Sequence, residues 1–213
     1  FSSETENRCI LNLGGIANIT WLPASTSTPA TGFDTGPANA LMDAWCLDQT
    51  GLPFDSDGHW AREGSVNKEL LDDMLSDAYF SKAPPKSTGK ERFNLEWVKT
   101  LVSRHPGIPA EDIQRTLLQL TVTSVVNQLP DTADLRVYVC GGGARNPLLM
   151  EELGKALPEA RLSLTSELGV DPQMVEPVAF AWLAKQALEG KPGNLPDVTG
   201  AAGPRILGAI YPA

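Results

Sequence analysis

The sequence predicts an α/β fold in which a mixed five-stranded sheet is flanked by helices. Apolar runs over 9–13 and 16–22 flank Gly14 and Gly15, a pattern that is typical of a β-hairpin. Further along, an apolar strand over 136–140 is followed by three glycines and then by a helical pattern. Strand, glycine turn and helix in that order form the β-α unit of parallel sheets. The antiparallel hairpin and the parallel unit together predict a sheet with strands in both directions.

Length and composition indicate one large domain or one lobe of a two-lobed protein. The chain has 213 residues, of which 42% are hydrophobic and 20% charged, as in an ordinary globular protein. Its formal charge of −9 is scattered, so we expect no nucleic-acid partner and no patch for anionic lipid. No apolar run reaches bilayer length and no signal peptide is recognisable, so we expect no membrane association. Because the chain begins at Phe1 rather than Met and is soon in its first strand, we expect a fragment or a processed chain.

The cysteines and histidines favour a cytoplasmic protein without zinc. Cys9, Cys46 and Cys140 are odd in number, far apart and set in apolar stretches, which is typical of reduced, buried thiols. His59 and His105 each stand alone, without neighbours at the spacing of a zinc site.

The first hairpin is the first candidate for chemistry. Gly14 and Gly15 readily take the positive φ angles of a two-residue turn, and without a Cβ they allow a phosphate to approach the backbone N–H groups. Asn12 and Asn18 flank the turn and could add side-chain amides. An ordinary tight turn is the alternative, and the dipeptide by itself favours it.

A third strand over 32–37 leads into a helix. Pro37 suits the first turn of that helix, whose expected apolar face is formed by Ala40, Leu41, Ala44, Trp45 and Leu47. Asp34 therefore lies at the end of a strand and faces the start of a helix. A carboxylate there is usually a turn or capping residue, and the alternative is a metal or substrate ligand.

Residues 51–109 are interpreted as a mainly helical insertion. Helical patterns over 66–76 and 94–103 alternate with loops that contain proline and glycine. Residues 84–91 contain the letters of a Walker A loop, but Ser-Thr precedes Gly-Lys and two prolines stand upstream. This order excludes a P-loop, whereas a loop that contacts substrate or a second subunit stays open.

The remaining chain reads as helix, strand, helix, strand and helix. A long helix is expected over 110–129, a strand over 136–140, a helix over 148–157, a strand over 161–165 and an apolar helix over 177–189. Asn146 can cap the third of these elements, and Pro147 fits its first turn.

The second glycine cluster, Gly141, Gly142 and Gly143, ends a strand, which is where open α/β sheets bind ligands. A nucleobase or ribose can lie against such a surface, and the following helix start favours a phosphate. A plain strand-to-helix turn is equally compatible, and the cluster is not a G-x-G-x-x-G dinucleotide motif.

Several motifs together resemble a known family. The resemblance rests on residues 12–18, 34–39 with 41–43, 85–91 with 93–94, 140–143 with Asn146, and Glu176 with 179–181. Their order is similar to the second lobe of the sugar-kinase, actin and heat-shock chaperone ATPases, a ribonuclease H-like layout. The closer match is to the carboxyl-terminal half of bacterial anhydro-N-acetylmuramic acid kinase, and it runs from about residue 8 to the end.

The resemblance implies a single lobe over 1–213 and an activity in peptidoglycan recycling. Kinases of this family open the 1,6-anhydro ring of anhydro-N-acetylmuramic acid with water and phosphorylate O6 from MgATP, which gives N-acetylmuramic acid 6-phosphate. ATP and Mg²⁺ are therefore the expected cofactors, and a homodimer is the expected assembly. Another acetate, sugar or acyl kinase, and a non-catalytic lobe that senses nucleotide or sugar, are the alternatives.

The resemblance also implies roles for individual residues, carried over by motif. The phosphate-binding residues are Asn12, Gly14, Gly15 and Asn18, and the nucleotide-binding residues are Gly141, Gly142, Gly143, Arg145 and Asn146. The residues expected to face substrate or metal are Asp34, Gly36, Asn39 and Glu176. Glu176 could instead be a first-turn acid that complements a helix dipole, and Val175-Glu176-Pro177 departs from the family's usual Met-Glu-Ala.

The family's first phosphate loop, Gly-Thr-Ser-x-Asp-Gly, does not occur in this chain. The resemblance places that loop and the aspartate that activates water in a first lobe, so we expect no catalytic residue and no direct metal ligand here. Phosphoryl transfer needs charges that converge from both sides of a cleft, and we therefore expect these residues alone not to turn over.

Overall fold

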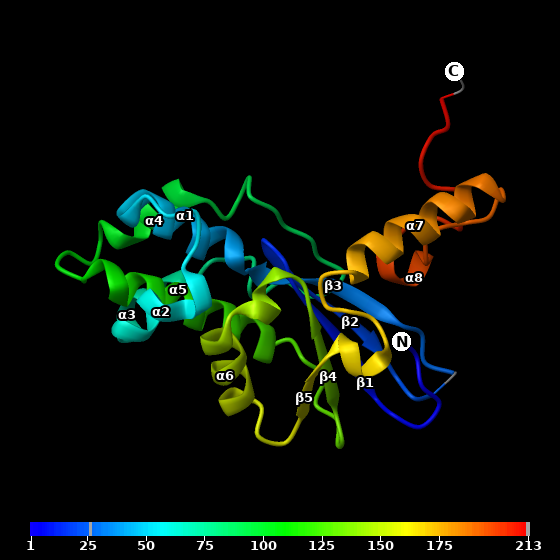
Figure 1. Cartoon of the computed structure of the whole chain (residues 1–213), viewed down its shortest axis with the longest axis horizontal. Helices are drawn as coiled ribbons and strands as arrows, with labels where there is room; N and C mark the ends of the chain where they lie inside the picture. The colour runs from blue at the N-terminus through cyan, green and yellow to red at the C-terminus, as the bar shows by residue number, and fades with distance from the viewer. Residues whose placement is uncertain (26, 212–213) are drawn as a thin grey trace.

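The computed structural model describes residues 1–25 and 27–211 and is built on one five-stranded sheet (Figure 1). The strands lie in the order β3-β2-β1-β4-β5. The hairpin neighbours β1, β2 and β3 pair antiparallel, whereas β1 with β4 and β4 with β5 pair parallel. The predicted mixed, ribonuclease H-like sheet is therefore confirmed. The strands are β1 (Arg8–Leu13), β2 (Ile16–Leu22), β3 (Thr31–Pro37), β4 (Arg136–Cys140) and β5 (Arg161–Leu164).

Helices fill the connections as the sequence patterns predict. Side-chain amides of Asn67, Asn94 and Asn146 accept a backbone N–H at the starts of three of the helices, α3, α4 and α6, and Pro147 occupies the first turn of α6. The α-helices are α1 (Asn39–Thr50), α2 (His59–Glu63), α3 (Lys68–Leu75), α4 (Leu95–Val102), α5 (Ala110–Val126), α6 (Pro147–Ala156), α7 (Val175–Leu188) and α8 (Pro196–Thr199). Short 3₁₀ turns are η1 (Ser56–Gly58), η2 (Gly142–Arg145) and η3 (Thr165–Leu168).

The main core lies between one face of the sheet and α5. Cys9, Leu11 and Leu13 alternate along β1 and are fully buried on this face, as period-2 strands require. The helix α5 touches β2 and β3 on one side and α1, α2, α3 and α6 on the others. Residues 51–109 carry η1, α2, α3 and α4, and Figure 1 shows these helices gathered at the end of the molecule away from α7.

The second face of the sheet is covered much less. Its buried apolar side chains are Ile10, Tyr138 and Cys140, with a few partly buried neighbours. The helix α7 forms over nearly the predicted range, but none of its residues is buried, and Phe180 and Trp182 are 70% and 50% exposed. Figure 1 shows α7 extending away from the sheet. The short helix α8 comes back to the sheet and contacts β3, where Val198 lies beside Gly32.

Three local expectations are wrong. Gly14 and Gly15 form the hairpin turn without a positive φ. Pro37 ends β3 instead of starting α1, because Ala38 is the residue that precedes the first helical turn. Leu47 is 55% exposed, and α1 buries Leu41, Met42, Trp45 and Cys46 instead.

Two further findings concern the cysteines and the lengths of the helices. Cys9, Cys46 and Cys140 are free and buried, as predicted, and burial raises the pKa of Cys9 to about 12 and that of Cys140 to about 11. Within 1–25 and 27–211, the helices are all too short or too polar to cross a bilayer.

Candidate functional site

The turn Gly14-Gly15 after β1 (the first corner) and the turn Gly141–Gly143 after β4 (the second corner) lie side by side at the carboxyl ends of these two strands. This follows from the parallel pairing of β1 and β4, because both corners come at the same ends of neighbouring strands. A Cβ built on Gly143 would lie 2.6 Å from Leu13 Cβ, and one on Gly141 would lie 2.9 Å from the Leu13 carbonyl. Gly141 also has a φ of 82°, which disfavours any side chain. The second corner therefore needs glycine in order to pack against the first.

The first corner has no such need. A Cβ on Gly15 would lie 3.5 Å from Lys90 Cε and 3.6 Å from Ala40 Cβ, which are ordinary contacts. On Gly14 it would meet the Ile16 carbonyl oxygen at 3.4 Å. Because neither glycine has a positive φ, the fold does not explain why both positions lack a side chain.

The start of α1 is attached to this first corner. The backbone N–H groups of Ala38 and Ala40 donate to the Gly15 carbonyl at 3.0 and 3.1 Å, and that of Asn39 donates to the Gly14 carbonyl at 3.1 Å. The Asn39 side chain donates from Nδ2 to the carbonyls of Gly14 at 2.8 Å and Leu13 at 2.9 Å. Asn39 thus fixes the turn, and the turn's carbonyl groups are directed toward α1.

Polar side chains form a row on the second face of the sheet. Asn12 pairs with Asn18 across β1 and β2, and Asn18 pairs with Asp34 across β2 and β3. Because their strand neighbours point into the core, these three side chains lie on the opposite face. Glu176, in the first turn of α7, accepts a hydrogen bond from Asn12 Nδ2 at 3.2 Å, and Asn12 Oδ1 is buried without a partner among the described residues. The structure therefore brings these four predicted residues together, and we call Asn12, Asn18, Asp34 and Glu176 the polar row.

The loop over 84–91 holds Asp34. The Asp34 carboxylate accepts hydrogen bonds from Ser87 Oγ at 2.7 Å and from the Thr88 backbone N–H at 3.0 Å. Lys86 is buried against the ring of Tyr79, with Nζ 4.8 Å from the ring centroid, and burial lowers the pKa of Lys86. A cavity of about 510 Å³ opens between this loop and the outer end of the polar row, at Asn18 and Asp34.

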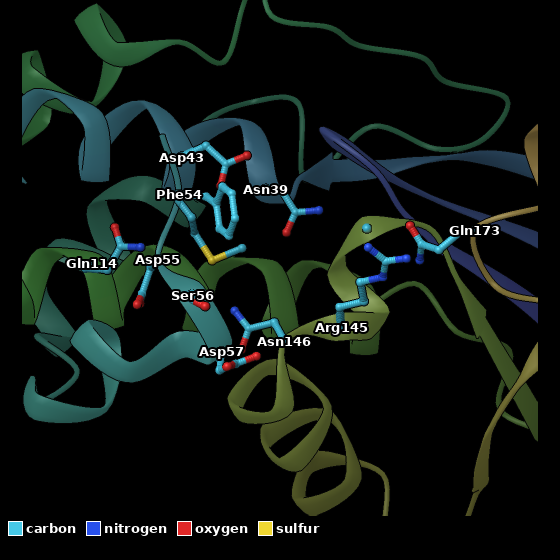
Figure 2. A pocket seen from close by; sticks show the side chains of 12 residues that line it. Asn39, Asp43, Phe54, Asp55, Ser56, Asp57, Gln114, Arg145, Asn146 and Gln173 are labelled. Atoms are coloured by element: carbon cyan, nitrogen blue, oxygen red, sulfur yellow. The ribbon is translucent and has the colours of Figure 1, made fainter. Parts of the chain in front are cut away.

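A separate cavity of about 410 Å³ begins at Gly142 in the second glycine corner (Figure 2). It lies between the first turns of α1, the segment 54–57 and η2, and it contains the predicted nucleotide-binding residues Gly142, Arg145 and Asn146. The side chain of Asn146 also caps α6, accepting from the Leu149 N–H at 3.1 Å. The residues that line this cavity are Asn39, Met42, Asp43, Phe54, Asp55, Ser56, Asp57, Gln114, Gly142, Arg145, Asn146 and Gln173.

Several lining residues escaped the sequence analysis. Burial raises the pKa of Asp43 to about 6, and the nearby charge of Lys90 opposes that rise. Asp43 follows Asn39 by one helical turn, and that spacing could have placed both on one face. Gln173 donates from Nε2 to the Gly141 carbonyl at 2.8 Å, and Gln114 comes from α5, far away in the sequence. No local signal links those two glutamines to the glycine corners.

Gly36 does not fit the role expected of it. A Cβ there would lie 2.8 Å from Phe80 Cε1 and 3.2 Å from Ser124 Oγ, and the residue is buried. Close packing of β3 against these side chains is sufficient to explain this glycine.

Metal ligands are sparse. Within residues 1–25 and 27–211, the structure contains no group of three or more His, Cys, Asp or Glu side chains that could hold an ion. A divalent cation at the glycine corners would therefore need oxygen ligands from a bound phosphate.

Comparison with known proteins gives a consistent result. A family model described as anhydro-N-acetylmuramic acid kinase matches residues 1–213. Curated proteins of that description include one from Pseudomonas paraeruginosa, 49% identical over 100% of this chain and 58% of its own length, and one from Shewanella halifaxensis, 50% identical with the same coverage. One from Xanthomonas axonopodis pv. citri is 50% identical over 98% of this chain and 55% of its own length. The chain thus spans a little over half the length of these relatives.

Solved structures resemble the chain more distantly. The activator of the 2-hydroxyisocaproyl-CoA dehydratase from Clostridium difficile, with bound ADPNP, is 15% identical and covers 80% of this chain and 56% of its own, with a TM-score of 0.46. Component A of the (R)-2-hydroxyglutaryl-CoA dehydratase from Acidaminococcus fermentans is 15% identical and covers 75% and 56%, with a TM-score of 0.42.

Proposed function

Because this chain belongs to the anhydro-N-acetylmuramic acid kinase family, we propose that it supplies the second, nucleotide-binding lobe of an ATP-dependent sugar kinase. The proposed reaction adds water across the 1,6-anhydro bond of anhydro-N-acetylmuramic acid and transfers the γ-phosphoryl group of ATP to O6. Its products are N-acetylmuramic acid 6-phosphate and ADP. This activity belongs to peptidoglycan recycling, and the three free, buried thiols suit the cytoplasm.

The observation that carries the proposal is the bare first corner. Glycine at positions 14 and 15 is required neither by backbone conformation nor by close neighbours. A requirement for close approach by a ligand explains what packing does not. We therefore assign the β- and γ-phosphates to the turn N–H groups of Gly14 and Gly15, with Asn18 beside them.

The nucleoside fits the cavity that begins at the same place. Asn39 is hydrogen-bonded to the first corner and, like Gly142 of the second corner, lines the cavity, which supports a nucleoside there that continues from a phosphate at the first corner. Arg145 offers a guanidinium to the phosphate or ribose oxygens. A volume of about 410 Å³ lies within the range of small-molecule and cofactor sites.

The polar row is the proposed sugar side. The polar row offers acceptors and donors along one face of the sheet, as hydroxyl groups require. Mg²⁺, when bound, would neutralise phosphate charge, and Asp34 and Glu176 are the carboxylates proposed to face it. We propose that the water-activating aspartate lies in a first lobe and that this chain does not turn over alone.

We further propose a homodimer to which the exposed residues of the 84–91 loop contribute. Equilibrium sedimentation of this chain and of a Lys90→Glu variant tests that assignment. A monomer for both would contradict it.

Gly15→Val tests the phosphate assignment. The added side chain occupies the space expected for phosphate, so we expect ATP affinity to fall by about tenfold or more while the hairpin stays folded. Gly154→Val is a matched control, because Gly154 in α6 has no atom within 4 Å of its Cβ position. Calorimetric titration measures binding, and circular dichroism checks the fold. Unchanged ATP affinity in Gly15→Val would remove the central assignment.

Turnover is tested separately. Incubation of these 213 residues with ATP and anhydro-N-acetylmuramic acid should give no sugar phosphate. Phosphorylated sugar would show that the chain needs no other lobe. Binding of nucleotide by a full-length protein that does not phosphorylate would favour the sensor instead.

A further inference from the structure

Gln114 is the buried polar side chain in the nucleotide cavity that the proposed function leaves unused. It lies on α5, is 1% exposed, and its Oε1 has no hydrogen-bond partner among the described residues. Its helical neighbours Ile113, Leu117 and Leu118 belong to the core. An unpaired amide in such surroundings costs folding free energy, on the order of 1–3 kcal/mol. A group retained at that cost is a candidate for binding a ligand.

The position of Gln114 matches the far end of a bound nucleotide. Figure 2 shows Arg145 and Gln173 on one side of the cavity, Asn39 between, and Gln114 on the opposite side. Asn39 is hydrogen-bonded to Gly14 in the first corner, where the phosphates are proposed to bind. A nucleoside that extends from there along the cavity brings its base toward Gln114.

One carboxylate in this cavity is already engaged. The Asp55 carboxylate accepts the backbone N–H groups of Trp60 and Ala61, both at 2.9 Å. Phe54, which is 56% exposed, also lines the cavity and offers a ring face on which any base can stack. Stacking provides affinity without selectivity, whereas the unpaired amide of Gln114 can distinguish one base from another by hydrogen bonding.

We propose that Gln114 selects adenine over guanine at this site, an inference that rests on the proposed function. An amide pairs in two places with the N6/N7 edge of adenine, accepting from the 6-amino group at Oε1 and donating from Nε2 to N7. Guanine presents two acceptors, O6 and N7, along the same edge, so the Oε1 atom faces a like dipole. The torsion angle of the terminal bond in a glutamine side chain is broadly distributed, so the amide can rotate until both of its polar atoms face the base.

Nucleotide analogues test the proposal on the unmodified chain. Calorimetric titration compares ATP, GTP and purine riboside triphosphate, which lacks the 6-amino group. A good bidentate pair discriminates by roughly 5- to 150-fold, so we expect GTP to bind weaker than ATP within that range. The purine analogue should bind several-fold weaker than ATP. Equal affinities for all three would overturn the role of Gln114, whereas no binding of any nucleotide would overturn the proposed function beneath it.

Gln114→Met isolates the amide. Methionine is similar in length and removes both hydrogen-bonding groups, so the ATP-to-GTP affinity ratio should fall to near one without loss of thermal stability. Gln119→Met is the matched control, because Gln119 lies on the same helix and donates to Thr123 instead. Its affinity ratio should equal that of the unmodified chain. A ratio preserved in Gln114→Met would overturn the proposal, and the analogue series stands on its own if that variant fails to fold.

Discussion

Alanine at Gly142 and at Gly143 should have opposite effects on stability, although the two residues are adjacent in η2. A Cβ on Gly143 would lie 2.6 Å from Leu13 Cβ and 3.1 Å from the Leu13 carbonyl oxygen. A Cβ on Gly142 meets only Asn39 Nδ2, at 3.8 Å. Neither glycine has a left-handed φ, so the difference between the two substitutions is one of packing.

The expected magnitudes follow from these contacts. Overpacking a buried site costs about 1–3 kcal/mol, and Gly→Ala returns about 0.4–1 kcal/mol by restricting the unfolded chain. Gly143→Ala should therefore lose roughly 1–2 kcal/mol of unfolding free energy, which lowers Tm by about 2–8 °C in a chain of this size. Gly142→Ala should be neutral or gain up to about 1 kcal/mol.

Urea denaturation followed by circular dichroism measures both variants, with thermal scans as a second probe. The m-value should be unchanged, so that a shift in midpoint reports stability alone. Equal losses in the two variants, or a larger loss in Gly142→Ala, would refute the packing of the second corner against β1.

Two predictions concern charge. Burial raises the pKa of Asp43 to about 6, so between about pH 4 and 6 the folded state binds more protons than the unfolded state and stability falls as pH rises. After allowance for partial exposure, Asp43→Asn should gain roughly 1 kcal/mol at pH 7 and nothing at pH 4, as measured by urea denaturation; an equal gain at both pH values contradicts this. Because Lys90 lies over Gly15, Lys90→Met should weaken ATP about fivefold and leave adenosine unchanged in calorimetric titrations. Lys99→Met, which removes an ion pair with Asp48, is the control, and equal losses for ATP and adenosine would contradict the prediction.

Much of the fold could be predicted because it is encoded locally. The range 136–140 was predicted for the fourth strand, and the cap at Asn146 was predicted from one amide followed by a proline. The adjacency of the two glycine corners followed from the pairing of a hairpin strand with a β-α strand. The pairing of Asn12 with Asn18 could be anticipated as well, since they flank the turn symmetrically. That Asp34 and Glu176 join them depends on the pairing of β3 and on the position of α7.

Tertiary contacts explain what the sequence did not reveal. Gln114 lies far from the glycine corners in the chain and reaches the cavity only because α5 crosses the sheet. Gly36 looks like a loop glycine until Phe80 and Ser124 are seen against it. The apolar pattern of α7 predicts a helix correctly but cannot say which surface covers it.

The attachment of α1 to the first hairpin has a thermodynamic consequence. Asn39 touches the turn with its amide and begins the helix that also carries Asp43 into the cavity. A pyrophosphate that orders the turn would therefore also order the start of α1, against which a nucleoside rests. The first ligand to bind would bear the entropy cost of ordering α1, and the second would not bear it again. The two halves of a nucleotide should then bind cooperatively, each more tightly when the other is already in place.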